Sequence, residues 1–243
     1  MTISGVVITK NEEGNIGDCL QSLSWTDEII LVDSGSTDAT LSIAKKFTPK
    51  TYQVPFIDFA SQKNAALERT TGDWVFFLDA DERVPEELAE EIRKTVEGGK
   101  KDSVYAVKRA TYFFGKRLRF SAAQKDAPIR LFPRGKARFE QPVHEQVITS
   151  LTIRRLKNSL THFSTRDFAH YQAKVQQYVP LELQVLRQKG KDANLLDLMV
   201  RPPAKFAYLY FWSLGFLDGW TGLQFAALSA YYCFVKYRKA RAS

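Results

Sequence analysis

The 243-residue sequence contains few cysteines, and this shortage limits the compartments in which the protein is expected to work. Cys19 and Cys233 lie far apart and are the only two, which excludes a disulfide framework and favours a reducing compartment. The first residues, MTISGVVITKNEE, lack the basic and apolar regions of a secretory signal. We therefore expect a protein of the cytosol or of the cytosolic face of a membrane.

Long apolar runs are also missing. The tail contains FAYLYFWSLGFL (206–217) and GWTGLQFAALSAYYCFV (219–235), separated by Asp218 and followed by KYRKAR. Both runs are shorter than the roughly 20 residues that span a bilayer. Short aromatic helices followed by cations are typical of a membrane interface. We predict such a helical anchor over residues 203–243. The alternative is a hairpin packed on the rest of the chain or pairing subunits of a homo-oligomer.

Acidic residues are scarce after the first hundred positions. The net charge is −9 over residues 1–99, +11 over 100–160 and +6 over 161–243. A basic region joined to an acidic one suggests that the basic part faces an anionic partner or surface, although cations can also simply solvate a surface. Aromatic residues and arginines alternate between 103 and 165, but no recognised nucleic-acid motif occurs there, so no nucleic acid is expected as a partner.

The first hundred residues alternate apolar β-rich runs with segments of helical spacing. The predicted strands are residues 3–10, 28–33, 51–54 and 74–80, and the predicted helices are 15–25, 41–47, 58–70 and 86–96. This alternation predicts an α/β fold, a Rossmann-like, mostly parallel sheet covered by helices. Irregular β-rich residues 103–165 complete the sheet. We expect three regions: 1–165, a helical connector over 166–202 with a helix ended by Gly190, and the anchor over 203–243.

Polar residues follow three of these strands directly, in TKNE (9–12), DSGS (33–36) and DAD (79–81). The carboxyl ends of parallel strands share one sheet edge, where ligands bind. Three acids, Asp79, Asp81 and Glu82, stand close together after the last of these strands, and such like charges need a compensating partner. Mg²⁺ or Mn²⁺ suits them, because carboxylates hold these ions together with phosphate oxygens and water. The alternative is a capping cluster for the helix after Pro85.

Four stretches carry a resemblance to a known family: VVITKNEEGNIGDCLQSL, EIILVDSGSTDATLSIA, QKNAALERTTGDWVFFLDADE and PVHEQV. They resemble the family 2 glycosyltransferases of GT-A fold and occur in that family's order within residues 3–147. The chain is similar to the lipopolysaccharide core β-1,4-glucosyltransferases in particular, and its tail FWSLGFLDGWTGLQFAALSAYY is similar to theirs. The resemblance implies that residues 1–99 form a donor half and 100–165 an acceptor half of one catalytic domain.

The resemblance also implies a nucleotide-diphospho sugar as donor, with UDP-glucose as the family-based expectation. Asp33 is then expected at the base, Glu12 at the ribose and Asp79 by the ribose or sugar. Arg130 is expected to contact the diphosphate or the acceptor, or to form a surface pair. The full implied donor site is Thr9, Asn11, Glu12, Asp33, Ser34, Lys63, Asp79 and Arg130.

Members of this family invert the sugar's anomeric centre in a single displacement, which needs one general base for the acceptor hydroxyl. Glu145 in PVHEQV is the candidate base. Asp79, Asp81 and His144 are the candidate metal ligands, with His162 as the rival of His144. His144 and Glu145 can serve one site only in a loop or bulge, because neighbours on a regular strand point to opposite faces.

The implied acceptor is a lipid-linked glycan such as the lipopolysaccharide inner core, reached from the cytosolic face of the inner membrane. Two alternatives stay open. A sugar nucleotidyltransferase has a similar α/β start, but usually carries a glycine-rich basic loop where this chain has TKNEEGN. A degenerate fold that serves as a membrane scaffold is the other alternative.

Overall fold

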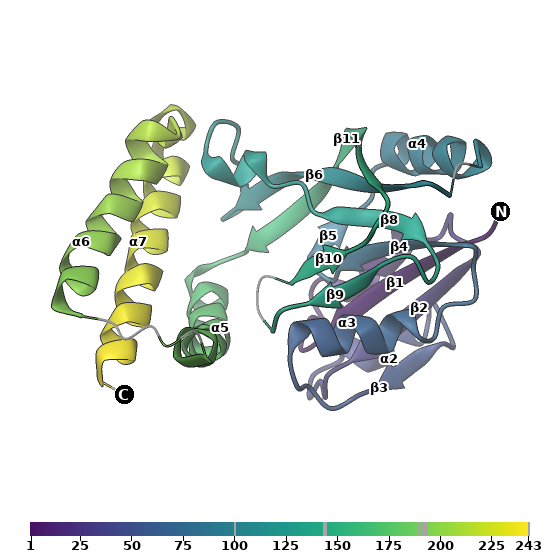
Figure 1. Ribbon diagram of the computed structural model, residues 1–243, viewed down its shortest axis with the longest axis horizontal. Coiled ribbons are helices and arrows are strands. Elements are labelled where there is room, and N and C mark those ends of the chain that lie inside the picture. The colour runs from purple at the N-terminus through teal and green to yellow at the C-terminus, as the bar shows by residue number, and fades with distance from the viewer. Residues whose placement is uncertain (100, 143–144, 189, 191–193, 243) are drawn as a thin grey trace. The chain divides into compact units, whose positions relative to one another are not determined.

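The computed structural model describes residues 1–99, 101–142, 145–188, 190 and 194–242 (Figure 1). The chain forms two units and passes between them more than once. The first unit is Met1–Arg109 with Ala127–His162, and the second is Ala110–Asp126 with Phe163–Ser243.

Parallel strands form the first half of the sheet, in the order β3-β2-β1-β4. These strands are β1 (Ile3–Thr9), β2 (Glu28–Asp33), β3 (Thr51–Gln53) and β4 (Trp74–Asp79). The helices along this stretch are α1 (Ile16–Gln21), α2 (Thr40–Ala44), α3 (Phe59–Leu67) and α4 (Glu86–Glu97). The predicted strands and helices of this region are confirmed, with ends that differ by a few residues.

Apolar residues fill both faces of these strands, as their unbroken apolar runs predict. Val7 and Leu78 belong to one buried cluster, whereas their neighbours Val6 and Phe77 belong to another. Successive strand residues point to opposite faces, so the two clusters cover the two sides of the sheet. With both faces covered, the ligand-accessible part of this half is the edge where the strands end.

The second half of the sheet departs from the prediction of a mostly parallel arrangement. β8 (Ile129–Pro133) runs antiparallel to β4, and β6 (Ser103–Phe113) antiparallel to β8. β11 (Thr152–Thr165) lies next to β6, and β5 (Glu82–Arg83) pairs antiparallel with β11. The sheet is therefore mixed. No long helix crosses over between residues 103 and 165 in the described chain, and strands joined by loops pair antiparallel.

Short strands complete this region. β9 (Arg138–Glu140) and β10 (Gln146–Ile148) form a separate antiparallel pair. β7 (Lys116–Arg117) pairs with the end of β6. A short 3₁₀ turn, η1 (Ala122–Lys125), follows it.

The second unit is built around helices. α5 (Phe168–Gln188) confirms the helix predicted before Gly190 and packs Val175 and Val179 against Val235 of α7 (Gly219–Ala242). α6 (Leu195–Ala207) and α7 run side by side as a hairpin (Figure 1). This hairpin begins before residue 203, the predicted start, because Asn194 and Asp197 form a capping box that starts α6. No helix within the described residues is long and apolar enough to cross a membrane.

The hairpin turns through a π-helical turn, η2 (Tyr208–Trp212), and a 3₁₀ turn, η3 (Gly215–Asp218). A Cβ atom added at Gly222 would lie 1.8 Å from the carbonyl oxygen of Gly215, so the two backbones meet where only glycine fits. Leu214 has a φ of 59°, in the left-handed region. This close approach breaks the apolar tail into two helices.

Candidate active site

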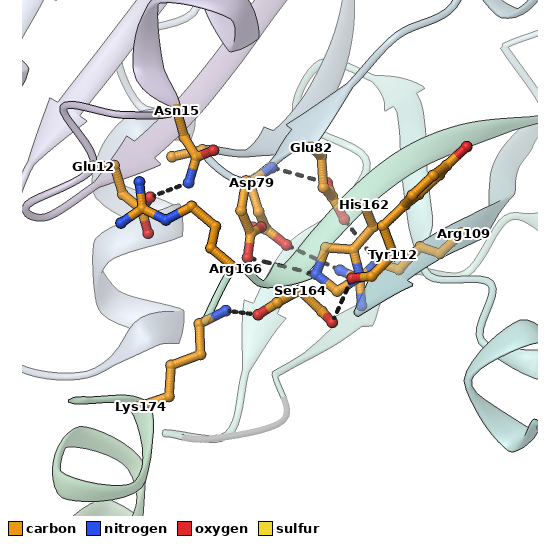
Figure 2. Close-up of polar contacts among 12 residues, drawn as sticks. Glu12, Asn15, Asp79, Glu82, Arg109, Tyr112, His162, Ser164, Arg166 and Lys174 are labelled. Atoms are coloured by element: carbon orange, nitrogen blue, oxygen red, sulfur yellow. Dashed lines mark hydrogen bonds and ion pairs between the residues drawn. The ribbon is translucent and has the colours of Figure 1, made fainter. Parts of the chain in front are cut away.

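Polar side chains from five strands, four of them acids or arginines, meet where β4 ends, all of them in the first unit. Asp79 is the last residue of β4, and Glu82 lies on β5. Arg109, Arg130 and His162 come from β6, β8 and β11. Figure 2 shows the side chains of Asp79, Glu82 and Arg109 converging. The predicted acidic cluster therefore meets cations from distant parts of the sequence.

Asp79 is in contact with three cations. Its Oδ2 accepts hydrogen bonds from Arg109 at 2.9 Å and from Arg130 at 2.5 Å. Its Oδ1 lies 3.2 Å from the Lys63 ammonium. Burial alone would raise the pKa of Asp79, but Arg130, Lys63 and Arg109 outweigh it and hold that pKa well below its usual range. Asp79 is therefore ionised at neutral pH.

Glu82 is fully buried and is bonded to the same two arginines. Its Oε2 accepts the backbone N–H of Asp79 at 2.9 Å, which closes the turn after β4. Its Oε1 accepts Arg109 Nε and Arg130 Nη2, each at 2.7 Å. The alternative that these acids cap the next helix is wrong, because α4 begins at Glu86 after its N-cap, Pro85, and has no side-chain cap.

Arg130 is 1% exposed, so it is a buried residue and not part of a surface pair. Its Nε has no hydrogen-bond partner among the described residues. Burial would lower the pKa of this guanidinium, but Asp79 and Glu82 raise it. Arg130 therefore combines a fixed positive charge with an N–H donor, at Nε, that is available to an anion.

Asp81 contacts one of the two candidate histidines. Its Oδ2 lies 3.5 Å from His162 Nε2, and His162 Nδ1 is buried without a partner among the described residues. Within the described chain, no three acidic, histidine or cysteine side chains gather closely enough to bind a metal alone. Asp81 and His162 fit an ion that takes its other ligands from phosphate and water. His144 lies outside the described residues.

Lys63 joins the predicted base to the acidic strand end. Its ammonium is bonded to Glu145 as well as to Asp79. The side chain is 4% exposed, and its Nζ lies 5.1 Å from the centroid of the Phe77 ring and 5.2 Å from that of Phe139. Two aromatic faces and two carboxylates therefore fix one cation. Through Lys63, Glu145 lies within the charged cluster although it is 66 residues beyond Asp79 in sequence.

The loops after β1 and β2 bind mainly each other. The carboxylate of Asp33 accepts the N–H groups of Gly35 and Ser36, each at 2.8 Å, and also the Ser36 hydroxyl. Asn11, with a φ of 53°, donates its N–H to Ser36 Oγ at 2.8 Å, and its Oδ1 accepts the N–H of Thr37 at 2.8 Å. Asp33 and Asn11 thus shape this edge through internal bonds.

Three further predicted donor residues lie at the same edge. Ser34 donates its N–H to the Thr9 carbonyl at 3.0 Å, while the Thr9 hydroxyl is buried without a partner among the described residues. Glu12 accepts the Asn15 amide at 2.7 Å, as Figure 2 shows. The structure therefore collects the predicted residues in two groups, the loop network of β1 and β2 and the charged cluster at β4.

Arg109 is the residue that sequence reasoning missed. The basic character of residues 100–160 indicated an anionic partner, but it did not identify the arginine that reaches Asp79. That choice depends on how β6 pairs with β8, and the pairing is irregular between Tyr105 and Ala106. A one-residue shift of register reverses the face of the sheet to which each later side chain points.

Comparisons with known proteins agree with this fold and identify the family. The family model described as glycosyl transferase family 2 matches residues 4–176. The chain belongs to this family and is a glycosyltransferase. It is 30% identical over 245 residues to the lipopolysaccharide core biosynthesis glycosyltransferase LpsC of Rhizobium meliloti (strain 1021), covering 95% of this chain and 91% of LpsC.

Two further matches extend over nearly the whole chain. An uncharacterized glycosyltransferase of Rickettsia typhi, RT0209, is 27% identical, over 98% of this chain and 86% of the relative. Among solved structures, S. aureus TarS 1-349 in complex with UDP-GlcNAc has a TM-score of 0.51 at 17% identity, covering all of this chain and 83% of TarS. That likeness is one of fold, and it is consistent with the expected GT-A architecture.

Proposed function

We propose that the enzyme transfers a sugar, glucose, from a UDP-linked donor to a lipid-linked glycan such as the lipopolysaccharide inner core, with inversion at the sugar carbon. One observation carries the proposal: at the carboxyl end of β4, three carboxylates meet three cations, two of them nearly fully buried, in a family 2 glycosyltransferase. Such a concentration of fixed charge suits a diphosphate and its counter-ion.

The donor's diphosphate is assigned to the end of β4. Asp81 and His162 would hold Mg²⁺ or Mn²⁺, and Asp79 would lie beside the sugar. When bound, this ion supplies Lewis-acid stabilisation of the leaving diphosphate. The spare Nε of buried Arg130 adds a positive donor at the same edge.

The base and ribose are assigned to the loops after β1 and β2. Thr9 has an unused buried hydroxyl there. Asp33 and Asn11 would hold the loop shape that receives the nucleoside, because their side chains are already bonded within the two loops. Glu12 would accept ribose hydroxyls. Residues 1–99 would thus form the donor half and 100–165 the acceptor half.

Glu145 is proposed as the general base. It is a carboxylate tied to Asp79 through Lys63, so it belongs to the cluster that receives the sugar. In this role the Glu145 carboxylate would accept the proton of an acceptor hydroxyl. Loss of that proton accompanies attack on the sugar carbon and departure of the nucleoside diphosphate.

The acceptor assignment draws on the name of LpsC, a protein of lipopolysaccharide core biosynthesis. An acceptor of that kind is anchored in lipid and carries negative charge, which matches the basic residues 100–160 and the aromatic tail. The enzyme would work peripherally on the cytosolic face of the inner membrane, with residues 203–243 near the bilayer.

Calorimetric titration of UDP-glucose, UDP-GlcNAc and GDP-mannose, with Mn²⁺ or with a chelator, tests the donor assignment. The matched variants are Asp81→Ala, at the proposed site, and Glu28→Gln, a carboxylate at the start of β2. We expect one donor to bind wild type and Glu28→Gln only with Mn²⁺, and to bind Asp81→Ala weakly or not at all. Absence of binding by every nucleotide sugar would instead favour a fold that has lost its donor and serves as a scaffold.

A further inference from the structure

The turn of the helical hairpin is bonded to a distant loop of the second unit through one carboxylate. Asp218 is the only charged residue between Tyr208 and Trp220. It accepts three backbone N–H groups: Arg119 at 2.7 Å, and Phe120 and Ser121 at 3.1 Å each. Successive N–H groups of this kind form a nest for an anion. The charge of Asp218 is therefore balanced by local dipoles.

Both segments that Asp218 joins, the hairpin turn and residues 119–121, carry exposed apolar side chains. Trp212, at the end of η2, is 82% exposed, and Trp220, at the start of α7, is 69% exposed. Phe120, whose N–H is bonded to Asp218, is 48% exposed. The set of exposed residues, called here the turn surface, is Phe120, Phe211, Trp212, Leu214, Phe216, Leu217 and Trp220. Large exposed apolar side chains gathered in this way mark an interaction site.

The loop that Asp218 holds is strongly basic. Residues 114–121 read FGKRLRFS, with Lys116, Arg117 and Arg119 exposed and no acidic residue. These three cations lie in the loop beside the turn surface, and the Asp218 carboxylate between the two is bonded to three backbone N–H groups. Tryptophan and phenylalanine beside exposed lysine and arginine are the composition that anionic lipid headgroups attract.

We propose that the turn surface, fastened by Asp218, docks on a bilayer that contains anionic lipid. The inference rests on the proposed function, in which the acceptor is linked to lipid. It assigns the docking role to the turn and residues 116–120, whereas the sequence predicted an anchor over the whole of residues 203–243, with the terminal cations KYRKAR at the other end of α7. Asp218 is a positioning residue here, because it joins Phe120 and the basic loop to the two tryptophans.

Sedimentation of the full-length protein with vesicles tests the proposal. We expect binding to vesicles of phosphatidylcholine with phosphatidylglycerol, weak binding to phosphatidylcholine alone, and loss of binding at high salt. Trp212→Ser and Phe120→Ser should each weaken binding about tenfold. Met199→Ser is the matched control: Met199 is 66% exposed on α6 but lies outside the turn, so binding should be unchanged.

Asp218→Ala tests the positioning role. It should weaken vesicle binding about as much as Phe120→Ser, and the double variant should be little worse than either, because both changes remove Phe120 from one surface. If Asp218→Ala does not fold, as judged by circular dichroism, Phe120→Ser and Trp212→Ser carry the test alone, since their side chains are exposed.

Three results would overturn the proposal: no binding to anionic vesicles, equal binding by wild type and Trp212→Ser, or a dimer in light scattering that Trp212→Ser abolishes. The last result would assign the turn surface to a second copy of the chain. Donor titration on the same variants separates the two hypotheses. Failure to dock with intact donor binding defeats only this inference, whereas absence of donor binding in wild type defeats the proposed function.

Discussion

Two carboxylates at opposite ends of the parallel strands are neutralised in different ways. Glu28, at the start of β2, pairs with one cation, Lys50, and otherwise accepts Ser4 Oγ at 2.5 Å and the N–H groups of Thr71 at 2.7 Å and Gly72 at 3.2 Å. Asp79, at the end of β4, contacts three cations. Both pKa values are lowered, that of Glu28 by Lys50 with hydroxyl and backbone donors, and that of Asp79 by Arg130, Lys63 and Arg109.

The difference indicates which end of the sheet binds a ligand. The Glu28 carboxylate holds together the starts of its neighbouring strands, and its oxygens are used by those bonds. Around Asp79, Arg130 Nε and His162 Nδ1 are buried without partners among the described residues. Buried polar atoms without partners are costly in a folded protein, and a bound substrate is one way to satisfy them.

The largest expected effect is the loss of activity in Asp81→Ala. Without this carboxylate the site keeps only His162 of the proposed metal pair, so sugar transfer should fall about 10³-fold. A transfer assay with Mn²⁺ and the donor identified by calorimetry measures this. Glu28→Gln is the control and should keep wild-type turnover; equal losses in the two variants would contradict the distinction between the two ends.

Glu145→Gln should reduce turnover roughly 10²- to 10⁴-fold, because the amide cannot accept the acceptor's proton. The Kd for the donor should stay close to the wild-type value. Parallel measurement of kcat and donor affinity checks this. A variant that loses donor affinity but keeps kcat would place Glu145 at the donor and not at the acceptor.

Lys63→Met should lower the free energy of unfolding by roughly 2–4 kcal/mol, because it removes one partner from two carboxylates at once. Urea denaturation measures the change. Lys50→Met is the matched control: its ammonium pairs with Glu28 and its side chain is 41% exposed, so the loss should be clearly smaller than in Lys63→Met. Similar losses would mean that the Lys63 cluster is no more strongly coupled than a surface pair.

Glu28→Gln should lower the free energy of unfolding by about 2 kcal/mol at neutral pH. Burial would raise the pKa of Glu28, but hydrogen bonds from Lys50, Ser4 and Thr71 lower it from 4.5 to about 2. Because its pKa is lower in the folded state, ionised Glu28 stabilises the fold at pH values above its unfolded pKa of 4.5. This stabilisation is lost as the pH falls toward the folded pKa of about 2. The difference between variant and wild type should therefore shrink between pH 4.5 and pH 2, as thermal melts across that range can show.

The sequence predicted the parallel half of the fold because its signals are local. An apolar run such as Trp74–Leu78, followed by Asp79, indicates a buried strand with a polar end. The partners of Asp79 are not local: Arg109 and Arg130 are 30 and 51 residues away and reach it through antiparallel pairing. Pairing register leaves only a weak trace in one sequence, so the acids were assigned a metal, Arg109 was missed, and Arg130 was not predicted to bind Asp79.

Other parts of the site show the same limit. The contact of Asp33 with a nucleoside base stays a prediction; the fold adds that its carboxylate closes its own loop, a bond that a short polar side chain makes with the next residues. Asp218 broke the apolar tail as predicted, yet its bond to residues 119–121 joins segments about a hundred residues apart. Residue type identified these positions, and only the fold supplies their partners.

The most direct test of the central claim is a crystal of the full chain soaked with Mn²⁺ and the UDP-linked donor, measured at the manganese absorption edge. We predict one anomalous peak beside Asp81 and His162, with the diphosphate between that peak and Arg130. A peak at another part of the sheet, or bound donor with no metal at the end of β4, would contradict the assignment of this edge as the catalytic site.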